Sequence, residues 1–302
     1  MILRLALVAA VLGLAGWTLA PMAPQLPGLL AQAGIGTLAA MVAAHVVPVA
    51  LCGAAWACVT PRVAPMRMMG LRWLRDGCNE MLAVVPLAGE IMALRCLGRW
   101  GVKPAAAGAG MVADLTAELA AQLLFTLIGL ALWGGHAGGA GVVRWGLPGL
   151  LGAVAVAIAF VAVQRGGGLA LAARLLPRQR VVAGLHRHLA ALYRRPRRLG
   201  GALALHLAAW LAACAEAWLA LRLLGHPLTV GQAIMLESAI FALRSVAFAV
   251  PGALGVQEGA YALLAPLLGV PPALALTLSL LKRGREVILG APALLMMLRR
   301  PK

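Results

Sequence analysis

The segment VPGALGVQEG, residues 250–259, interrupts a long apolar region with a proline, three glycines and a carboxylate. The flanks, residues 240–249 and 260–268, are almost entirely apolar. Irregular backbone at membrane depth survives only where protein or a water-filled cavity supplies hydrogen-bond partners. Acidic residues inside membrane segments are costly and usually functional. The segment therefore predicts a broken helix at a functional site, with a tight turn between two ordinary spanning helices as the alternative.

A second interrupted segment, VVPLAGE at residues 84–90, matches the first at an offset of 168 residues, which places Glu90 on Glu258. The same offset superposes further landmarks: Gly101-Val102 on Gly269-Val270, Pro104 on Pro272, and Glu118 on Glu286. One register for all of them predicts an internal repeat, a feature of many transporters, over about 79–134 and about 237–298. Chance matching among helices rich in glycine and alanine is the alternative.

Composition points to the membrane. The 302 residues are 63% hydrophobic and 12% charged, with a mean hydropathy of +0.93, whereas soluble domains are about half apolar and a quarter charged. We therefore expect one all-α, polytopic transmembrane domain over 1–302. The net charge of +17 would suggest nucleic acid in a soluble protein. Here the basic residues flank apolar segments, so their expected partners are anionic lipid headgroups and not nucleic acid.

The apolar runs predict about six spanning helices plus two re-entrant broken-helix elements, since about twenty residues cross the bilayer. The spans are expected at 1–20, 34–59, 104–133, 142–163, 201–224 and 271–298. Residues 79–100 hold the first broken element and are too short and too charged for two full crossings, and residues 231–268 hold the second broken element. The first span is expected to be uncleaved, because residues 18–20 make a poor signal-peptidase site, and 21–33 to form a loop.

Arginine-rich segments set the predicted orientation. Residues 60–78 and 164–200 read as basic segments on the membrane surface, and the positive-inside rule makes their side cytoplasmic, together with both termini. The first broken element then enters from the cytoplasm and the second from outside, so the repeat is inverted. Two full crossings in place of each broken element would leave every loop on the same side, so topology alone does not separate these readings.

Seven of the nine acidic residues lie in apolar segments or broken elements: Glu90, Asp114, Glu118, Glu216, Glu237, Glu258 and Glu286. The final span also carries Lys282, Arg283 and Arg285. Each such charge costs roughly 2.5–3.5 kcal/mol on insertion scales, so the group needs a compensating role. The spacing predicts an i,i+4 pair of Lys282 with Glu286.

Further charged pairs are expected because some segments carry acidic residues without a basic neighbour and others carry basic residues without an acidic one. Asp114 and Glu118 have no basic neighbour on their helix face, so they are expected either to meet Arg283 and Arg285 on another helix or to lie in water at the cytoplasmic boundary. Structural pairs are expected for Glu216 with Arg222 and for Glu237 with Arg244. The five scattered cysteines show no metal-ligand spacing, and no nucleotide or nucleophile motif is found; we expect no metal, no cofactor and no enzymatic activity.

The quoted segment, together with SLLKRGRE at residues 279–286, resembles the flippase-like transmembrane domain of lysylphosphatidylglycerol synthases. Within that superfamily it is most similar to hopanoid-associated bacterial membrane proteins. Pro86, Gly89, Glu90 and Arg95 are similar to the first-half motif, while Leu87 and Ala88 depart from it. The resemblance implies lipid translocation or handling at the bacterial inner membrane. Lysyl transfer is not expected, because the soluble aminoacyl-transfer domain has no counterpart here.

The resulting hypothesis is a lipid transporter or flippase for hopanoid or related lipids, in which Glu90 and Glu258 line a central cavity. The expected substrate or ion pathway also includes Arg95, Asp114, Glu118, Arg244, Gln257, Lys282, Arg283, Arg285 and Glu286. The broken-helix backbone is assigned to Pro86, Gly89, Pro251, Gly252, Gly255 and Gly259. The rival readings are a membrane-embedded transferase acting on a polyprenyl or triterpenoid lipid, and a non-catalytic subunit that partners lipid-biosynthesis enzymes.

Overall fold

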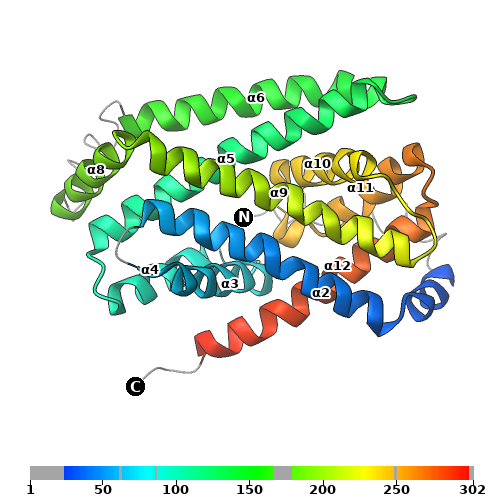
Figure 1. The fold of residues 1–302 in the computed structure, drawn as a ribbon, viewed down its shortest axis with the longest axis horizontal. Helices are drawn as coiled ribbons and strands as arrows, with labels where there is room; N and C mark the ends of the chain where they lie inside the picture. Colours follow the sequence, from blue (N-terminus) through cyan, green and yellow to red (C-terminus); the bar gives the residue numbers. More distant parts are fainter. Residues whose placement is uncertain are drawn as a thin grey trace, which may run out of the picture.

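The computed structural model describes residues 24–60, 63–83, 85, 87–165, 179–247 and 250–298. These residues form helices without any strand, which confirms the all-α prediction (Figure 1). The α-helices are α2 (Leu26–Val59), α3 (Pro65–Met81), α4 (Ala88–Arg99), α5 (Pro104–Gly134), α6 (Ala140–Arg165), α8 (Gln179–Tyr193), α9 (Pro196–Leu223), α10 (Val230–Val246), α11 (Val256–Leu264) and α12 (Pro272–Leu298). Two short 3-10 helices, η2 (Pro251–Ala253) and η3 (Ala265–Leu268), flank α11.

Four of these helices, α2, α5, α6 and α9, are long and apolar enough to cross a membrane. They coincide with four of the predicted spans, so the chain is a polytopic membrane protein. The span predicted at 1–20 lies outside the described residues. The last predicted span is α12, which is 27 residues long and carries its charged residues near the middle.

The start of α2 corrects one prediction. The loop expected over 21–33 is wrong from Leu26 onward, because α2 begins there. Pro27 is tolerated in the first helical turn, where a backbone N–H has no intrahelical acceptor to lose. The helix is interrupted instead at Gly34, which has a φ of 67°. Glycine adopts a positive φ readily because it has no Cβ.

Helices from the first half of the chain pack on helices from the second half. The helix α2 lies along α9, α3 packs on α12 and α2, and α10 packs on α5 and α9. On the other side of α5 lies α6, at the outer edge of the molecule, with most of its side chains exposed (Figure 1). Two large apolar clusters make the core: one surrounds Trp56 and Leu97, the other Trp133 and Tyr261.

Glycines allow close helix contacts at both ends of α5. A Cβ on Gly129 would lie 1.7 Å from Ser238 Oγ of α10, and one on Gly110 would lie 2.4 Å from Thr60 Oγ1. Small residues commonly let helix backbones approach in membrane proteins. These two contacts hold α5 against α10 and against the end of α2.

Both predicted broken elements are present. In the first, α3 is followed by a turn and the short α4; in the second, α10 is followed by η2 and the short α11. At 1.5 Å per residue, α4 and α11 are about 18 and 14 Å long, well short of the ~30 Å hydrocarbon core. Each short helix follows a residue of positive φ, Leu87 at 62° and Gly255 at 77°, three positions before a glutamate.

The two basic segments, 60–78 and 164–200, differ in how far their arginines are buried. The prediction that 60–78 lies on the membrane surface is wrong, because α3 packs on α2, α4 and α12 and buries Arg72 and Arg75. Burial is possible because carboxylates surround both guanidinium groups. Within 164–200, α8 is amphipathic as predicted, with Leu185, Leu189 and Leu192 packed into the core; residues 166–178 lie outside the described residues.

A hydrogen bond fixes the end of α8. The Tyr193 hydroxyl donates to Gln164 Oε1 of α6 at 2.5 Å, and the Arg165 guanidinium lies 5.1 Å from the Tyr193 ring. Burial raises the pKa of the Tyr193 hydroxyl above its ordinary value, so the group stays a neutral donor at physiological pH. This contact ties α8 to the end of α6.

Candidate site: two charged clusters at the helix breaks

The first cluster is built around Arg72 of α3. Its Nη2 and Nη1 donate to the two carboxylate oxygens of Glu118 at 2.5 and 3.1 Å, and its Nε donates to Asp76 Oδ2 at 2.6 Å. Arg72 is 5% exposed, so the fork-shaped pairing replaces solvation that the guanidinium has lost. One turn of α3 thereby binds the middle of α5.

Arg75, one turn further along α3, connects this cluster to the first helix break. Its Nε donates to Glu90 Oε1 at 2.9 Å, and Asn79 Nδ2 donates to both Glu90 oxygens. The Gly89 N–H donates to Asn79 Oδ1 at 2.8 Å, and a Cβ at Gly89 would lie 2.1 Å from the Arg75 carbonyl oxygen. Glu90 and Gly89 therefore hold the start of α4 against α3.

Asp114 completes the first cluster. It is 1% exposed, and its Oδ1 lies 2.9 Å from His206 Nε2 of α9. Its Oδ2 is 3.6 Å from Arg72 Nη1 and 3.8 Å from Arg75 Nη1. Both readings offered for Asp114 and Glu118 are wrong: they neither meet the arginines of α12 nor lie in water, because they contact the arginines of α3 and, for Asp114, His206.

The second cluster begins with a buried ion pair between Lys282 of α12 and Glu237 of α10, whose side chains are 4% and 0% exposed. The Tyr261 hydroxyl donates to Glu237 Oε1 at 2.5 Å. The Lys282 ammonium also lies 5.6 Å from the Phe241 ring centroid and 5.8 Å from that of Tyr261. The predicted pairs Lys282–Glu286 and Glu237–Arg244 are therefore wrong, because helix-to-helix contacts take these groups.

Glu286 has three guanidinium partners in place of Lys282. Its Oε1 is 3.2 Å from Arg244 Nη1 and 3.6 Å from Arg285 Nη2, and its Oε2 is 3.1 Å from Arg283 Nη1. Arg244 also donates to Gln257 Oε1 at 2.5 Å. One carboxylate thus connects α10, α11 and α12.

Arg285 extends the second cluster to α2 and α9. Its Nε is 3.4 Å from Glu216 Oε2, and its Nη1 is 2.7 Å from a ring nitrogen of His45. His45 also pairs with Glu216. The predicted Glu216–Arg222 pair is wrong; the Arg222 guanidinium lies 5.4 Å from the Trp218 ring instead.

Glu258 caps the short helix after the second break. The Gly255 N–H donates to its Oε2 at 2.8 Å, and its Oε1 accepts from Arg283 Nε at 3.1 Å and from Ser279 Oγ at 3.4 Å. Arg283 Nη2 also donates to the Ala253 carbonyl oxygen at 3.4 Å. The carboxylate therefore both ends the break and binds it to α12.

The two breaks lie against each other. A Cβ placed on Gly252, in the second break, would lie 3.8 Å from Ala83 Cβ in the first break and 3.8 Å from Arg283 Nη1. Gly252 has a φ of 60°, a conformation open to glycine. Arg283 is thus the charged side chain nearest to the contact, and its side chain is 19% exposed.

Four further residues were predicted to belong to the site or to the breaks. Pro86 lies outside the described residues, and Gly259 falls inside α11 with open space around its Cα. Arg95 is exposed on α4 and, among the described contacts, joins neither cluster. Pro251 begins η2, as expected for a break residue.

Sequence reasoning missed several members of the clusters, among them His45, Arg72, Arg75, Asn79 and His206. Only one signal pointed to them: Asp114 and Glu118 lacked basic neighbours on their own helix, so cations had to come from elsewhere. Arg72 and Arg75, three residues apart, share a face of α3 and could have been assigned that role.

These features define a class of protein: a polytopic helical membrane protein that buries two networks of charged side chains at two adjoining helix breaks. Residues 1–293 match the family described as the lysylphosphatidylglycerol synthase TM region. The chain belongs to this family, which confirms the resemblance and indicates a membrane protein of lipid metabolism or transport. No curated protein and no solved structure gives a significant match.

Proposed function

We propose that this protein translocates amphiphilic lipids between the leaflets of the bacterial inner membrane, as a transporter and not as an enzyme. The observation that carries the proposal is the contact of the two helix breaks beside Arg283 and Glu258. Broken helices in membrane proteins offer free backbone groups to polar ligands. A charged headgroup would exchange with these side chains as the breaks part, while its acyl chains stay in lipid. Hopanoid or related lipids are the proposed substrates, on the family resemblance.

The proposal includes an inverted repeat. Supporting it, the left-handed residues match at the offset of 168 found in the sequence: Leu87 with Gly255, and Gly101 with Gly269 at φ values of 79° and 80°. Helix contacts match too, since α3 packs on α12 while α10 packs on α5. Two halves that exchange contacts in this way can rock against each other and open a path alternately to the two sides.

Orientation gives a first prediction. With the termini and 164–200 cytoplasmic, a cysteine at Ala137 faces outside and one at Gly200 faces the cytoplasm. Both positions are exposed. In a background without native cysteines, an impermeant thiol reagent applied to intact cells is expected to label only Ala137→Cys; permeabilised cells are the control. Labelling of Gly200→Cys from outside would overturn the orientation.

The proposed function is tested with purified protein in vesicles that carry fluorescent lipid analogues. Vesicles with protein are expected to expose inner-leaflet analogues to an impermeant quencher faster than protein-free vesicles, and mass spectrometry is expected to find the lipids unchanged. Covalent change of the lipid would favour the transferase reading. Translocation equal to protein-free vesicles would contradict the proposal, and co-purification with a biosynthetic enzyme would then favour an assembly subunit.

A further inference from the structure

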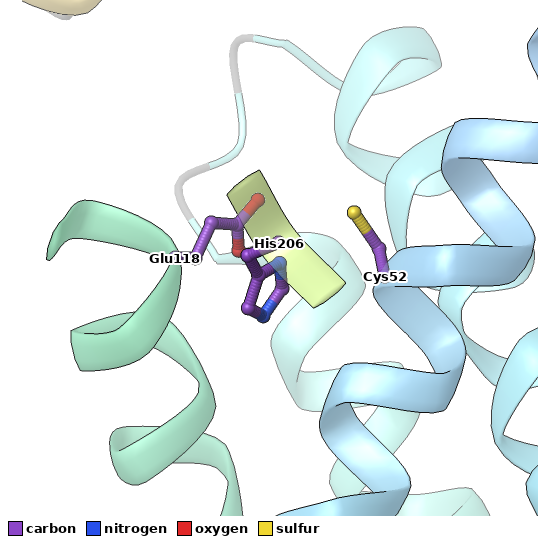
Figure 2. Close-up of side chains that lie close together, drawn as sticks. All are labelled: Cys52, Glu118 and His206. Atoms are coloured by element: carbon purple, nitrogen blue, oxygen red, sulfur yellow. The ribbon is translucent and has the colours of Figure 1, made fainter. Parts of the chain in front are cut away.

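A cysteine, a glutamate and a histidine from three different helices converge beside the first cluster. Cys52 of α2, Glu118 of α5 and His206 of α9 each offer a ligand atom, and these atoms all lie within 4.8 Å of one another. Figure 2 shows the sulfur, the carboxylate and the imidazole facing one another across the space between the helices. No pair of them is near in sequence, so motif spacing could not reveal the group.

His206 is oriented as metal-ligating histidines usually are. Its Nε2 is held by Asp114 Oδ1 at 2.9 Å, while its Nδ1 is buried without a hydrogen-bond partner. The residue is 0% exposed, so bulk water does not satisfy Nδ1. In metal sites the other ring nitrogen almost always donates to a carboxylate, a backbone carbonyl or a water, which fixes the orientation of the ligating nitrogen. Asp114 occupies that place, and Nδ1 is the atom that His206 has free.

Charge balance around the group also calls for a cation. Four carboxylates, those of Asp76, Glu90, Asp114 and Glu118, lie within ion-pair distance of two guanidinium groups, those of Arg72 and Arg75. With His206 neutral, the four carboxylates outnumber the two guanidinium groups by two, although the side chain of Asp76 is 30% exposed and therefore partly solvated. Uncompensated buried charge is strongly unfavourable. A divalent cation bound through the Cys52 thiolate adds one net positive charge and so reduces this excess.

We propose that Cys52, Glu118 and His206 bind a divalent transition metal of the zinc class, with Asp114 positioning the histidine. Thiolate, imidazole and carboxylate are the ligand types that Zn²⁺ takes, and three protein ligands leave a fourth position for water. On binding, the Cys52 thiol releases its proton to water and its sulfur bonds the metal. Each carboxylate oxygen has two lone pairs, so Glu118 keeps its bonds to Arg72.

The ligand atoms need only small movements to reach the metal. Bonds of about 2.0–2.3 Å to a tetrahedral ion place the ligand atoms about 3.3–3.7 Å apart. The three ligand atoms already lie within 4.8 Å of one another, so their separations must shorten by at most about 1.5 Å. The bound metal ties α2, α5 and α9 together beside the first helix break.

The test uses Co²⁺, whose bond to a thiolate produces an absorption band in the near ultraviolet. Purified, chelator-treated wild-type protein is expected to bind one Co²⁺ per chain with this band, and Zn²⁺ is expected to displace it. Cys52→Ala is expected to lose the band. Cys58→Ala is the matched control, because Cys58 lies on the same helix, beside Gly201 and outside the group; it is expected to keep the band.

A second variant tests the positioning residue. Asp114→Asn is expected to keep the band while weakening Co²⁺ affinity by about 10–100-fold, the usual effect of losing an outer-shell carboxylate. Folded wild-type protein without the band, or an unchanged band in Cys52→Ala, would overturn the proposal. Because these readouts follow the metal and not lipid movement, their failure leaves the proposed function to be judged separately.

Discussion

Replacing Lys282 with methionine is expected to destabilise the protein by about 3–5 kcal/mol, the usual loss when one partner of a buried ion pair is removed. Glu237 would keep its charge at 0% side-chain exposure, with only the Tyr261 hydroxyl as a donor. Methionine matches the length of the lysine stem, so the change tests charge and not packing. The free energy of unfolding in mixed detergent micelles measures the effect.

A double-mutant cycle identifies the partner. Adding Glu237→Gln to Lys282→Met removes the unpaired charge and keeps an acceptor for Tyr261, so the double variant is expected to recover about 1–3 kcal/mol of the loss. Adding Glu286→Gln instead is the control and should give additive effects, because Glu286 pairs with three arginines. Recovery by Glu286→Gln but not by Glu237→Gln would support the i,i+4 pair of Lys282 with Glu286 and contradict the pair of Lys282 with Glu237.

The second large effect is expected for Glu258→Gln, which should abolish lipid translocation while the protein still folds. Glutamine keeps an oxygen that accepts the Gly255 N–H, so α11 retains its cap. One of the two carboxylates that hold Arg283 loses its charge, and with it goes the ion pair beside the two breaks, while the pair with Glu286 remains. Glu90→Gln is expected to act in the same direction but more mildly, because Asn79 also supports that break. Initial rates in vesicles give the measurement.

Ser279→Ala is the matched control for this variant. It removes the hydrogen bond from the Ser279 hydroxyl to Glu258 Oε1 and the one that Ser279 Oγ accepts from Gln257 Nε2, and it leaves the Glu258 charge and its ion pair with Arg283 in place, so translocation is expected to stay near wild type. Full translocation by Glu258→Gln would show that the carboxylate only caps α11. An equal loss of translocation in Ser279→Ala and Glu258→Gln would instead indicate that any weakening of the local hydrogen bonds is sufficient to stop translocation.

Much of the fold was predictable because its signals are local. Proline and glycine inside apolar runs marked both breaks, and glutamates three residues into the short helices marked where those helices begin. Mean hydropathy and segment length identified the four apolar helices that the structure describes as candidate spans. Each of these features depends on residues near one another in the chain, which periodicity and composition can read.

Charge pairing was not predictable in the same way. None of the three pairs that the spacing suggested forms: Glu237 pairs instead with Lys282 of another helix, and Glu216 with Arg285. An i,i+4 spacing only makes a pair possible, whereas the rotation of each helix and its neighbours decide which partner is reached. For the same reason α3, which is basic and rich in methionine, was predicted to be a surface helix although its Arg72 and Arg75 are buried.

The most direct test of lipid translocation through the paired breaks is a reversible disulfide between them. A Cβ on Gly252 lies 3.8 Å from Ala83 Cβ, within the range of about 3.5–4.5 Å found in disulfides. Translocation by Ala83→Cys/Gly252→Cys is measured in vesicles, in a background without native cysteines, before and after reduction, with each single variant as control. We expect the oxidised double variant to be inactive and reduction to restore its rate. A fully formed disulfide with unchanged translocation would contradict a route that requires the breaks to part.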